Sequence, residues 1–489
     1  MPNLIVVNNP KNWTFEIPGV ELVSAKSYLS EEHYSQMRQV RIFNLCKSYR
    51  YQSIGYYVSL LASARGHKPL PNITTIQDMK SQTLIRFVDD DLDELIQKNL
   101  SVIEEDSYNM SIYFGRSVNR QFDRLALHLY NLFPAPLLKA EFLRGKDGWH
   151  LHSIDPVSTG EIPEEHYNFL VEVATGHFSG RVVSTVKRRT LRYDLAILWD
   201  PEEKEGPSNE KAIKRFISAG EKLGLNTEVI SRDDYGRIAE YDALFIRETT
   251  SVNHHTYRFA RRAEAEGLVV VDNPESILRC SNKVYLAELL DCHNIPTPKT
   301  SIAHKDNLEE CIREIGVPCV LKQPDSAFSQ GVLKTETEEM FMREANRMLS
   351  KSDLIVVQEY LPTDFDWRVG IFDRKPLFVC KYFMARNHWQ IIKRDPIGRK
   401  LEGRFETLPV ELAPFQVIRL ALKAANLIGD GLYGVDIKQV DKKYYIMEIN
   451  DNPNVDAGIE DLVAKQNLYD RIMEVFLKRI LTSKNGIAY

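Results

Sequence analysis

Three oxygen-bearing side chains near the C-terminus have the types and spacing of a metal site. Glu448 interrupts the apolar strand in YIMEINDNPN (445–454), and Asn450 follows two residues later, on the same face if the strand continues. A short turn at 441–443 joins this strand to YGVDIKQV, so the two should pair antiparallel and bring Asp436 beside Glu448. Two carboxylates and an amide oxygen suit a hard cation such as Mg²⁺. The alternative is an ordinary hairpin with polar residues at its open end.

Two lysines stand where a phosphate could bind. Lys322 interrupts the apolar strand VPCVLKQ, and the small polar loop after it contains Gly331, where the backbone could approach a phosphate. Lys283 lies in the first turn of a predicted helix, where the helix dipole disfavours a positive charge unless an anion is present. For each lysine alone, the alternative is a side chain that extends to solvent.

Further polar residues follow the strong apolar strand in VVQEYLP. They are Gln358, Glu359 and Tyr360, and then Asp366 and Arg368 in the pattern D-x-R. A different match, GDGLYG (429–434), has the G-x-G-x-x-G spacing, but it follows a helix and precedes a strand. The dinucleotide-binding fingerprint needs the opposite order of elements, so we exclude that interpretation.

The elements that must position these residues divide the chain into parts. Residues 1–160 combine short strands with helices and are predicted to be mixed α/β. A helical connector spans 161–193. Residues 194–280 alternate strand and helix, which is the pattern of a small parallel α/β unit. Residues 281–482 form a third, larger unit that contains the polar residues above.

Taken in order, these motifs resemble the ATP-grasp superfamily, and most closely the RimK-type amino-acid ligases, over roughly residues 194–480. The order is lysine, strand lysine, Gly-containing loop, QEY, D-x-R, and D…E-x-N. The unit at 194–280 is similar to a pre-ATP-grasp domain. The first part, with CKSYRYQSIGYYVSLLASARGHKPLP, resembles the accessory domain fused to RimK-like proteins. The expected fold is therefore α/β and α+β, with a C-terminal ATP-grasp domain at 281–482.

The resemblance implies a role for each motif residue. Lys283 and Lys322 would hold the α- and β-phosphates of ATP, and Arg368 would lie where an acyl phosphate or substrate carboxylate collects. Glu359 and Tyr360 would line the adenine pocket, Asp366 would accept from the ribose, and Gln358 would also belong to the ATP-binding set. Mg²⁺ (or Mn²⁺) would be bound by Asp436, Glu448 and Asn450.

One region departs from the RimK pattern, because the segment after the second hairpin lacks a Gly-Gly pair. It reads KYFMARNHWQIIKRDPIGRKLEGRFETLP and is strongly cationic. We interpret it as a lid in which Lys381 and Arg386 assist catalysis and Asn387, His388 and Arg404 bind an acidic substrate. The alternative is an exposed basic loop. Arg247, which closes a strand of the middle unit, could hold a substrate carboxylate or pair with a nearby acid.

The function implied is an ATP- and Mg²⁺-dependent carboxylate–amine ligase that forms an amide or peptide bond, releasing ADP, on an amino acid or short peptide. Alternatives are a ligase that modifies a protein docked on the first domain, and a non-catalytic nucleotide sensor.

Composition limits the partners of the chain. A net charge of −5 over 489 residues lacks the basic excess of a nucleic-acid binder, and no apolar run approaches the length of a membrane span. Six cysteines without C-x-x-C spacing and the absence of a signal-peptide pattern predict a cytoplasmic protein. The expected partners are ATP and amino-acid or peptide substrates, with a homo-oligomer possible.

Overall fold

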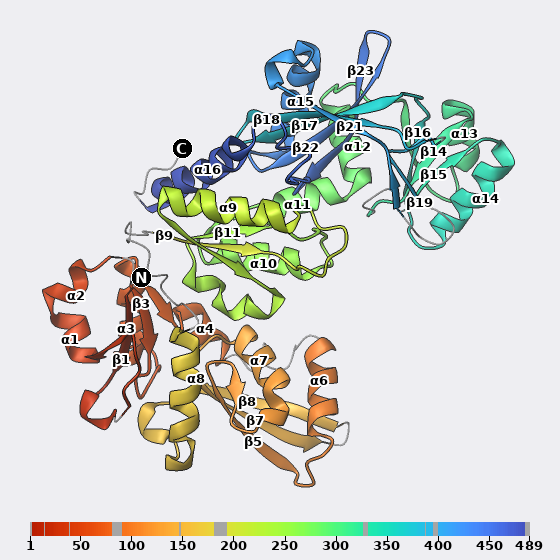
Figure 1. Ribbon diagram of the computed structural model, residues 1–489. Helices are drawn as coiled ribbons and strands as arrows, with labels where there is room; N and C mark the ends of the chain where they lie inside the picture. Colours follow the sequence, from red (N-terminus) through yellow and green to blue (C-terminus); the bar gives the residue numbers. More distant parts are fainter. Residues whose placement is uncertain are drawn as a thin grey trace. The chain divides into compact units, whose positions relative to one another are not determined.

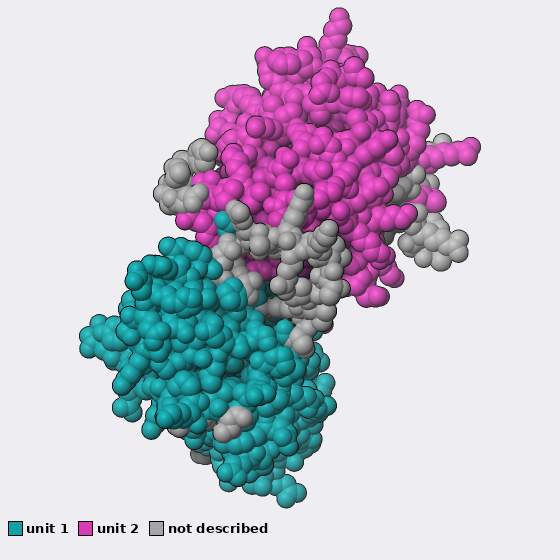
Figure 2. Space-filling view, turned by 60° about the vertical axis from the view of Figure 1, so that its left-hand side comes forward, with its two compact units in different colours: residues 1–193, 233–241 teal, residues 194–232, 242–489 magenta. Residues whose placement is uncertain are grey.

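The computed structural model describes residues 2–13, 15–38, 40–80, 90–145, 148–179, 193–325, 331–386, 388–394 and 400–484. Its chain divides into two compact units, shown in different colours in Figure 2. The first unit contains residues 1–193 together with the short segment 233–241. The second contains residues 194–232 and 242–489. None of the described helices is both long enough and apolar enough to cross a membrane.

The first unit begins with a parallel four-stranded sheet that has the order β2-β1-β3-β4. Apolar side chains of the central strands are buried against helices α1 and α3 on one face of this sheet. The hydroxyl of Ser53 accepts from the Tyr56 backbone N–H and thereby caps the start of α3. The elements are β1 (Asn3–Val7), β2 (Val20–Ser24), α1 (Ala25–Ser30), β3 (Arg41–Asn44), α3 (Ile54–Ala64) and β4 (Lys68–Leu70).

A second sheet of the first unit is antiparallel and has the order β6-β5-β7-β8. Two helices, α6 and α7, contribute apolar side chains to the core on one face of this sheet (Figure 1). The elements are α6 (Asp90–Leu100), β5 (Ser107–Tyr113), β6 (Arg116–Ser117), α7 (Asp123–Leu132), β7 (Leu137–Gly145), β8 (Gly148–Pro156) and α8 (Tyr167–Ser179).

The second unit starts with a four-stranded sheet of order β10-β9-β11-β12, in which β11 is parallel to both its neighbours. Helix α9 ends at Gly224, whose φ of +85° is the left-handed conformation that suits a helix C-cap. The C-terminal helix α16 packs along α9 (Figure 1). The elements are β9 (Tyr193–Leu198), α9 (Glu210–Leu223), β10 (Leu225–Ile230), β11 (Ala243–Ile246), α10 (His255–Ala265), β12 (Val269–Val271) and α16 (Gln466–Lys484).

Two antiparallel sheets complete the second unit, and both carry residues singled out in the sequence. The smaller has the order β13-β16-β14-β15 and is covered by helices α13 and α14 (Figure 1). Its elements are β13 (Thr300–Ala303), α13 (Leu308–Ile315), β14 (Cys319–Lys322), β15 (Val332–Thr335), α14 (Glu338–Leu349) and β16 (Ile355–Glu359).

The larger sheet has the order β21-β18-β17-β22-β23, and helices α11, α12 and α15 bury its apolar face. A turn with Asp441 at a φ of +53° closes the β22–β23 hairpin, as the sequence predicts. The elements are α11 (Pro274–Ser281), α12 (Lys283–Cys292), β17 (Phe365–Phe372), β18 (Lys375–Phe383), β21 (Phe405–Leu408), α15 (Phe415–Ile428), β22 (Tyr433–Val440) and β23 (Lys443–Asp451). A small hairpin, β19 (Ile392–Arg394) with β20 (Lys400–Glu402), lies between β18 and β21 in sequence.

Candidate active site

Three charged residues face one another across three adjacent strands of the larger sheet. Arg368 on β17 lies opposite Asp436 on β22, and Asp436 lies opposite Glu448 on β23. Directly opposed residues of antiparallel strands point to the same face, so the three side chains converge there. Asn450 joins them, because its Nδ2 donates to Asp436 Oδ2 at 3.2 Å. The structure therefore brings together the three predicted metal ligands and the predicted arginine.

The donor set of this face fits Mg²⁺ that is bound together with phosphate. Within the described ranges, no group of three or more His, Cys, Asp and Glu side chains could by itself hold a metal ion. Asp436 and Glu448 provide only two carboxylates, and the side-chain amide of Asn450 lies beside Asp436. Mg²⁺ commonly takes one or two protein carboxylates and completes its shell with water and substrate phosphates.

Arg368 and Asp436 form a bidentate ion pair, with Nε and Nη2 of the arginine donating to the two carboxylate oxygens. Burial alone would lower the pKa of Arg368, but the charge and hydrogen bonds of Asp436 outweigh it and raise the pKa. Gly434 leaves room for this arginine, because a Cβ there would lie 3.2 Å from Arg368 Cδ and 2.6 Å from Pro453 Cβ. The guanidinium is thus held in one place and permanently charged.

Glu448 forms an ion pair with Lys283, whose Nζ lies 2.7 Å from Glu448 Oε1. Lys283 is the first residue of α12, and the helix is capped by the side chain of Asn282. Burial would raise the pKa of Glu448, but the positive charges of Lys283 and Lys322 reverse this effect and lower it. In this structure, the negative charge of Glu448 is therefore balanced by Lys283.

Lys322 is the last residue of strand β14 and interacts electrostatically with Lys283 and Glu448. Its pKa is lowered to about 8, mainly by burial; Lys283 and Lys438 contribute to the lowering, whereas Glu448 and Asp366 oppose it. A bound anion would stabilise the protonated form of such an amine. This is the environment expected for a phosphate-binding lysine before the phosphate arrives.

Lys438, which was not among the residues predicted from sequence, forms a second ion pair. Its Nζ lies 2.7 Å from Asp366 Oδ1 and donates to Thr363 Oγ1 at 2.6 Å. The spacing of Lys438 two residues after Asp436 puts both side chains on one face, and this spacing could have identified it. Asp366 thus enters the site already paired with a lysine.

Gln358, Glu359 and Tyr360, all predicted to bind ATP, differ in their surroundings. Gln358 is 5% exposed, and its Nε2 donates to Thr300 Oγ1 at 2.9 Å. Its Oε1 is buried and, in the part of the chain that the structure describes, accepts no hydrogen bond. Glu359 is exposed. The Tyr360 ring lies beneath Lys334, with Nζ 4.0 Å from the ring centroid. Gln358 therefore offers an acceptor that a ligand could use.

The predicted lid residues lie in varied positions. Lys381 opposes Trp367 in the sheet, so it points to the face opposite Arg368, where it pairs with Glu406 at 3.3 Å. Arg386 is exposed, and Asn387 falls outside the described residues. The Nε2 atom of His388 lies 3.2 Å from Gln390 Oε1, and Arg404 stacks over the Phe383 ring at 4.1 Å. The structure does not bring Lys381 to the charged cluster.

Arg247 is fully buried, and its described donors are taken up inside the protein. It donates to Ser208 Oγ at 3.0 Å, to Asn452 Oδ1 at 2.6 Å, and to the carbonyl oxygens of Pro207 and Pro453. Burial lowers its pKa to about 10. Its side chain therefore fixes the DNPN turn after β23 and is not presented to a substrate.

Comparison with known proteins identifies two regions of the chain. Residues 25–173 match the family described as RimK-like ATPgrasp N-terminal domain, and residues 280–454 match an ATP-grasp domain family. The alpha-aminoadipate–LysW ligase LysX of Saccharolobus solfataricus is 28% identical over 255 residues, which make up 49% of this chain and 88% of that protein. A probable alpha-L-glutamate ligase of Marinomonas sp. is 26% identical over 269 residues, 52% of this chain and 87% of that protein.

A solved D-alanine–D-alanine ligase from Bacillus anthracis also aligns with the structure. It is 17% identical, covers 60% of this chain and 99% of its own, and has a TM-score of 0.47.

Proposed function

Because the chain carries a RimK-like ATP-grasp N-terminal domain followed by an ATP-grasp domain, we propose that it is an ATP- and Mg²⁺-dependent carboxylate–amine ligase. The observation that carries this proposal is the convergence of Asp436, Glu448 and Asn450 with Lys283 and Lys322 around one sheet face. A non-catalytic nucleotide sensor has no need of a complete metal-ligand set beside a phosphate site.

Different residues of this face would bind different parts of ATP. Lys283 and Lys322 would hold the α- and β-phosphates, Asp366 would accept from the ribose, and the buried Oε1 of Gln358 would accept from the adenine amino group. Mg²⁺, when bound, neutralises charge on the phosphates, and Asp436, Glu448 and Asn450 would hold it.

Arg368 supplies the fixed positive charge of the reaction centre. A substrate carboxylate would attack the γ-phosphoryl group to form an acyl phosphate, and ADP would leave. An amine would then displace phosphate from the acyl carbon to form the amide. Phosphoryl transfer is accelerated mainly by positioning and by fixed charges, and the bidentate pair with Asp436 holds the Arg368 guanidinium rigidly for that role.

The substrate class we propose is an acidic amino acid. The names of both relatives reported above contain an acidic amino acid, alpha-aminoadipate in one and L-glutamate in the other. Arg404, on the segment between β18 and β21, would contribute the positive charge that recognises the second carboxylate.

Incubation of the purified chain with ATP, Mg²⁺ and a mixture of amino acids tests this proposal. Mass spectrometry should detect a condensation product that forms with equal amounts of ADP and phosphate. Glu448→Gln should abolish all three, whereas Glu339→Gln, at an exposed position of α14 that is not among the proposed ATP, metal or substrate ligands, should retain them. Absence of both ADP and any condensation product would overturn the proposal that the chain is a ligase of free amino acids.

A second candidate function is favoured by an exposed apolar row on the first unit. Tyr51 is 69% exposed, and Ile54, Tyr57 and Leu60, spaced along one side of α3, are 39%, 38% and 38% exposed. Lys47 and Arg50, just before the helix, are also exposed. Apolar side chains beside two cations fit a peptide with acidic and apolar residues, so the row would dock a protein whose carboxylate is the substrate.

This second candidate predicts direct binding of a peptide to the full chain. A fluorescein-labelled peptide of alternating glutamate and leucine should bind, and Tyr51→Ser with Tyr57→Ser should weaken it at least tenfold. The matched peptide with lysine in place of glutamate should not bind. Equal binding of both peptides, or no effect of the substitutions, would exclude docking at this row.

A further inference from the structure

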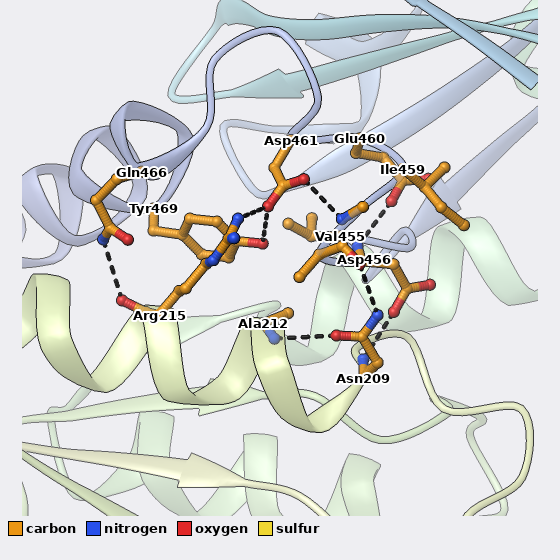
Figure 3. A network of polar contacts seen from close by, with 12 residues as sticks. Asn209, Ala212, Arg215, Val455, Asp456, Ile459, Glu460, Asp461, Gln466 and Tyr469 are labelled. Atoms are coloured by element: carbon orange, nitrogen blue, oxygen red, sulfur yellow. Dashed lines mark hydrogen bonds and ion pairs between the residues drawn. The ribbon is translucent and has the colours of Figure 1, made fainter.

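The loop between β23 and α16 carries a buried glutamate, Glu460, and is fastened firmly to helix α9 (Figure 3). Asp456 Oδ1 accepts from the Asn209 backbone N–H at 2.7 Å. Asp461 pairs with Arg215 and also accepts from the Tyr469 hydroxyl at 2.9 Å. With both sides of the loop held to helices, the position of Glu460 between Asp456 and Asp461 is well defined.

The carboxylate of Glu460 is 1% exposed and has two described donors. The Asp456 backbone N–H donates to its Oε2 at 2.7 Å, and the Tyr382 hydroxyl donates to its Oε1. The neighbouring residue is tied to the sheet as well, because Thr407 Oγ1 donates to the Ile459 carbonyl at 2.7 Å. A carboxylate so oriented can exchange a proton with one partner, Tyr382.

Tyr382 connects this carboxylate to the charged face of the site. It lies opposite Asp366 in the sheet, and therefore on the same face as Arg368. The Arg368 guanidinium is 5.5 Å from the centroid of the Tyr382 ring. Contacts thus run from Asp436 through Arg368 and Tyr382 to Glu460, which has no part in binding ATP or metal in the function proposed above.

We propose that Glu460 is the proton acceptor for the amine substrate and acts through the Tyr382 hydroxyl. The inference rests on the proposed ligase function and names the protein groups that activate the nucleophile. The amine arrives as an ammonium ion, which cannot attack a carbonyl. Its proton would pass to the Tyr382 oxygen while the tyrosine proton passes to Glu460, leaving a neutral amine.

The remaining steps balance the reaction. The amine nitrogen forms a bond to the acyl carbon and the bond from that carbon to the phosphate oxygen breaks. The nitrogen loses a second proton, and the phosphate leaves as HPO₄²⁻ with that proton. Glu460 then returns its proton to solvent, so one proton is released for each amide formed.

The electrostatic surroundings suit this role. The pKa of Glu460 is raised to about 7, mainly by burial; the negative charge of Asp456 contributes to the rise, whereas the hydrogen bonds from Tyr382 and from the Asp456 backbone oppose it. Such a value is well placed for a base that works near neutral pH. Among the residues that the structure describes, Arg368, Cys380 and Arg247 also interact electrostatically with Glu460.

Hydroxylamine separates this proposal from a structural role of Glu460. It is largely neutral at pH 7, so it captures an acyl phosphate without needing a base on the protein. The full chain would be incubated with ATP, Mg²⁺ and the amino-acid mixture, with and without hydroxylamine. Glu460→Gln should slow amide formation by about 10²–10⁴-fold and should slow hydroxamate formation far less.

Two further variants complete the experiment. Tyr382→Phe keeps the Asp456–Glu460 contact and should show the same imbalance between amide and hydroxamate, even if Glu460→Gln does not fold. Asp461→Asn loosens the same loop and should change both products in parallel. The amide rate of the wild type should rise as pH increases through about 7, and this rise should disappear in Glu460→Gln.

Each result decides between the hypotheses. Parallel loss of amide and hydroxamate in Glu460→Gln and Tyr382→Phe, or no loss of amide in either, would overturn the inference about Glu460 while leaving the ligase intact. Failure of the wild type to form either product would overturn the proposed ligase acting on free amino acids, and the inference with it.

Discussion

Lys283 Nζ lies 2.7 Å from Glu448 Oε1, so the proposed phosphate ligand and the proposed metal ligand neutralise each other. Both side chains are buried or half-buried, which makes an unpaired charge at either position costly. Binding of ATP with Mg²⁺ would exchange this one contact for two, from Lys283 to phosphate and from Glu448 to metal. Each of the two side chains would therefore have a partner of opposite charge both with and without the ligands.

Lys283→Met should have opposite effects on metal binding at Glu448 and on ATP binding. Glu448 would lose its closest cation, so Mn²⁺ without nucleotide should bind about tenfold more tightly, equivalent to about 1.4 kcal/mol. Binding of ATP with Mg²⁺ should weaken, because a phosphate contact is lost. Mn²⁺ titration followed by electron paramagnetic resonance measures the first effect and calorimetry the second. Lys283→Arg, which retains the charge, is the control, and weaker Mn²⁺ binding in Lys283→Met would contradict the exchange.

The Arg368–Asp436 pair should contribute to stability as a unit. Each single substitution, Arg368→Met or Asp436→Asn, leaves one partner buried without its counter-charge and should lower the free energy of unfolding by about 3–5 kcal/mol. The double substitution should cost less than the sum of the two, because neither charge remains unpaired. Urea unfolding followed by tryptophan fluorescence measures this, since Trp367 lies in the core beneath the pair. Strict additivity would show that the two side chains are not coupled.

Lys322 should make ATP binding dependent on pH. Burial lowers its pKa to about 8, so the free protein loses this positive charge as the pH rises through that value. Phosphate binds the charged form, and the dissociation constant for ATP with Mg²⁺ should therefore increase about tenfold per pH unit above 8. Lys322→Arg should remove the dependence, because arginine stays protonated. Calorimetric titrations between pH 7 and about 9.5 would detect it, and a flat profile in the wild type would contradict the assignment.

Gln358 should discriminate between purine bases. Its buried Oε1 can accept from the 6-amino group of adenine, whereas the 6-oxo group of inosine presents a second acceptor. Gln358→Met should weaken ATP binding by about 1–3 kcal/mol and leave ITP binding nearly unchanged. Gln358→Glu keeps an acceptor and serves as the matched control. An equal loss for both nucleotides would show that Oε1 does not read the base.

The β22–β23 hairpin could be predicted from sequence because its information is local. Alternation within each strand and a short turn near Asp441 are sufficient to set Asp436 opposite Glu448. The partners of these residues could not be predicted in the same way. Lys438 pairs with Asp366, more than seventy residues earlier, only because β17 lies beside β22 in the sheet. Strand order is a property of the whole core and leaves no periodic signal.

Lys381 shows how much depends on register. From the sequence, Lys381 was predicted to assist catalysis from a lid together with Arg386; in the structure it lies in the same hairpin as Arg368. Lys381 lies opposite Trp367 rather than Arg368. This difference of one residue in register directs its side chain to the other face of the sheet. Its predicted catalytic role stays a prediction, and in the structure its Nζ instead lies 5.1 Å from the centroid of the Trp367 ring.

Arg247→Ala should reduce stability rather than substrate binding. The fully buried guanidinium donates to Pro207, Ser208, Asn452 and Pro453, and its removal would leave these acceptors unpaired beneath the DNPN turn. We expect a loss of at least about 3 kcal/mol in the free energy of unfolding, and Arg247→Lys should recover only part of it because lysine lacks the planar fork. At temperatures where the variants remain folded, the KM for the acidic substrate should change less than twofold. A large rise in KM without a loss of stability would instead restore the role of Arg247 as a substrate carboxylate ligand.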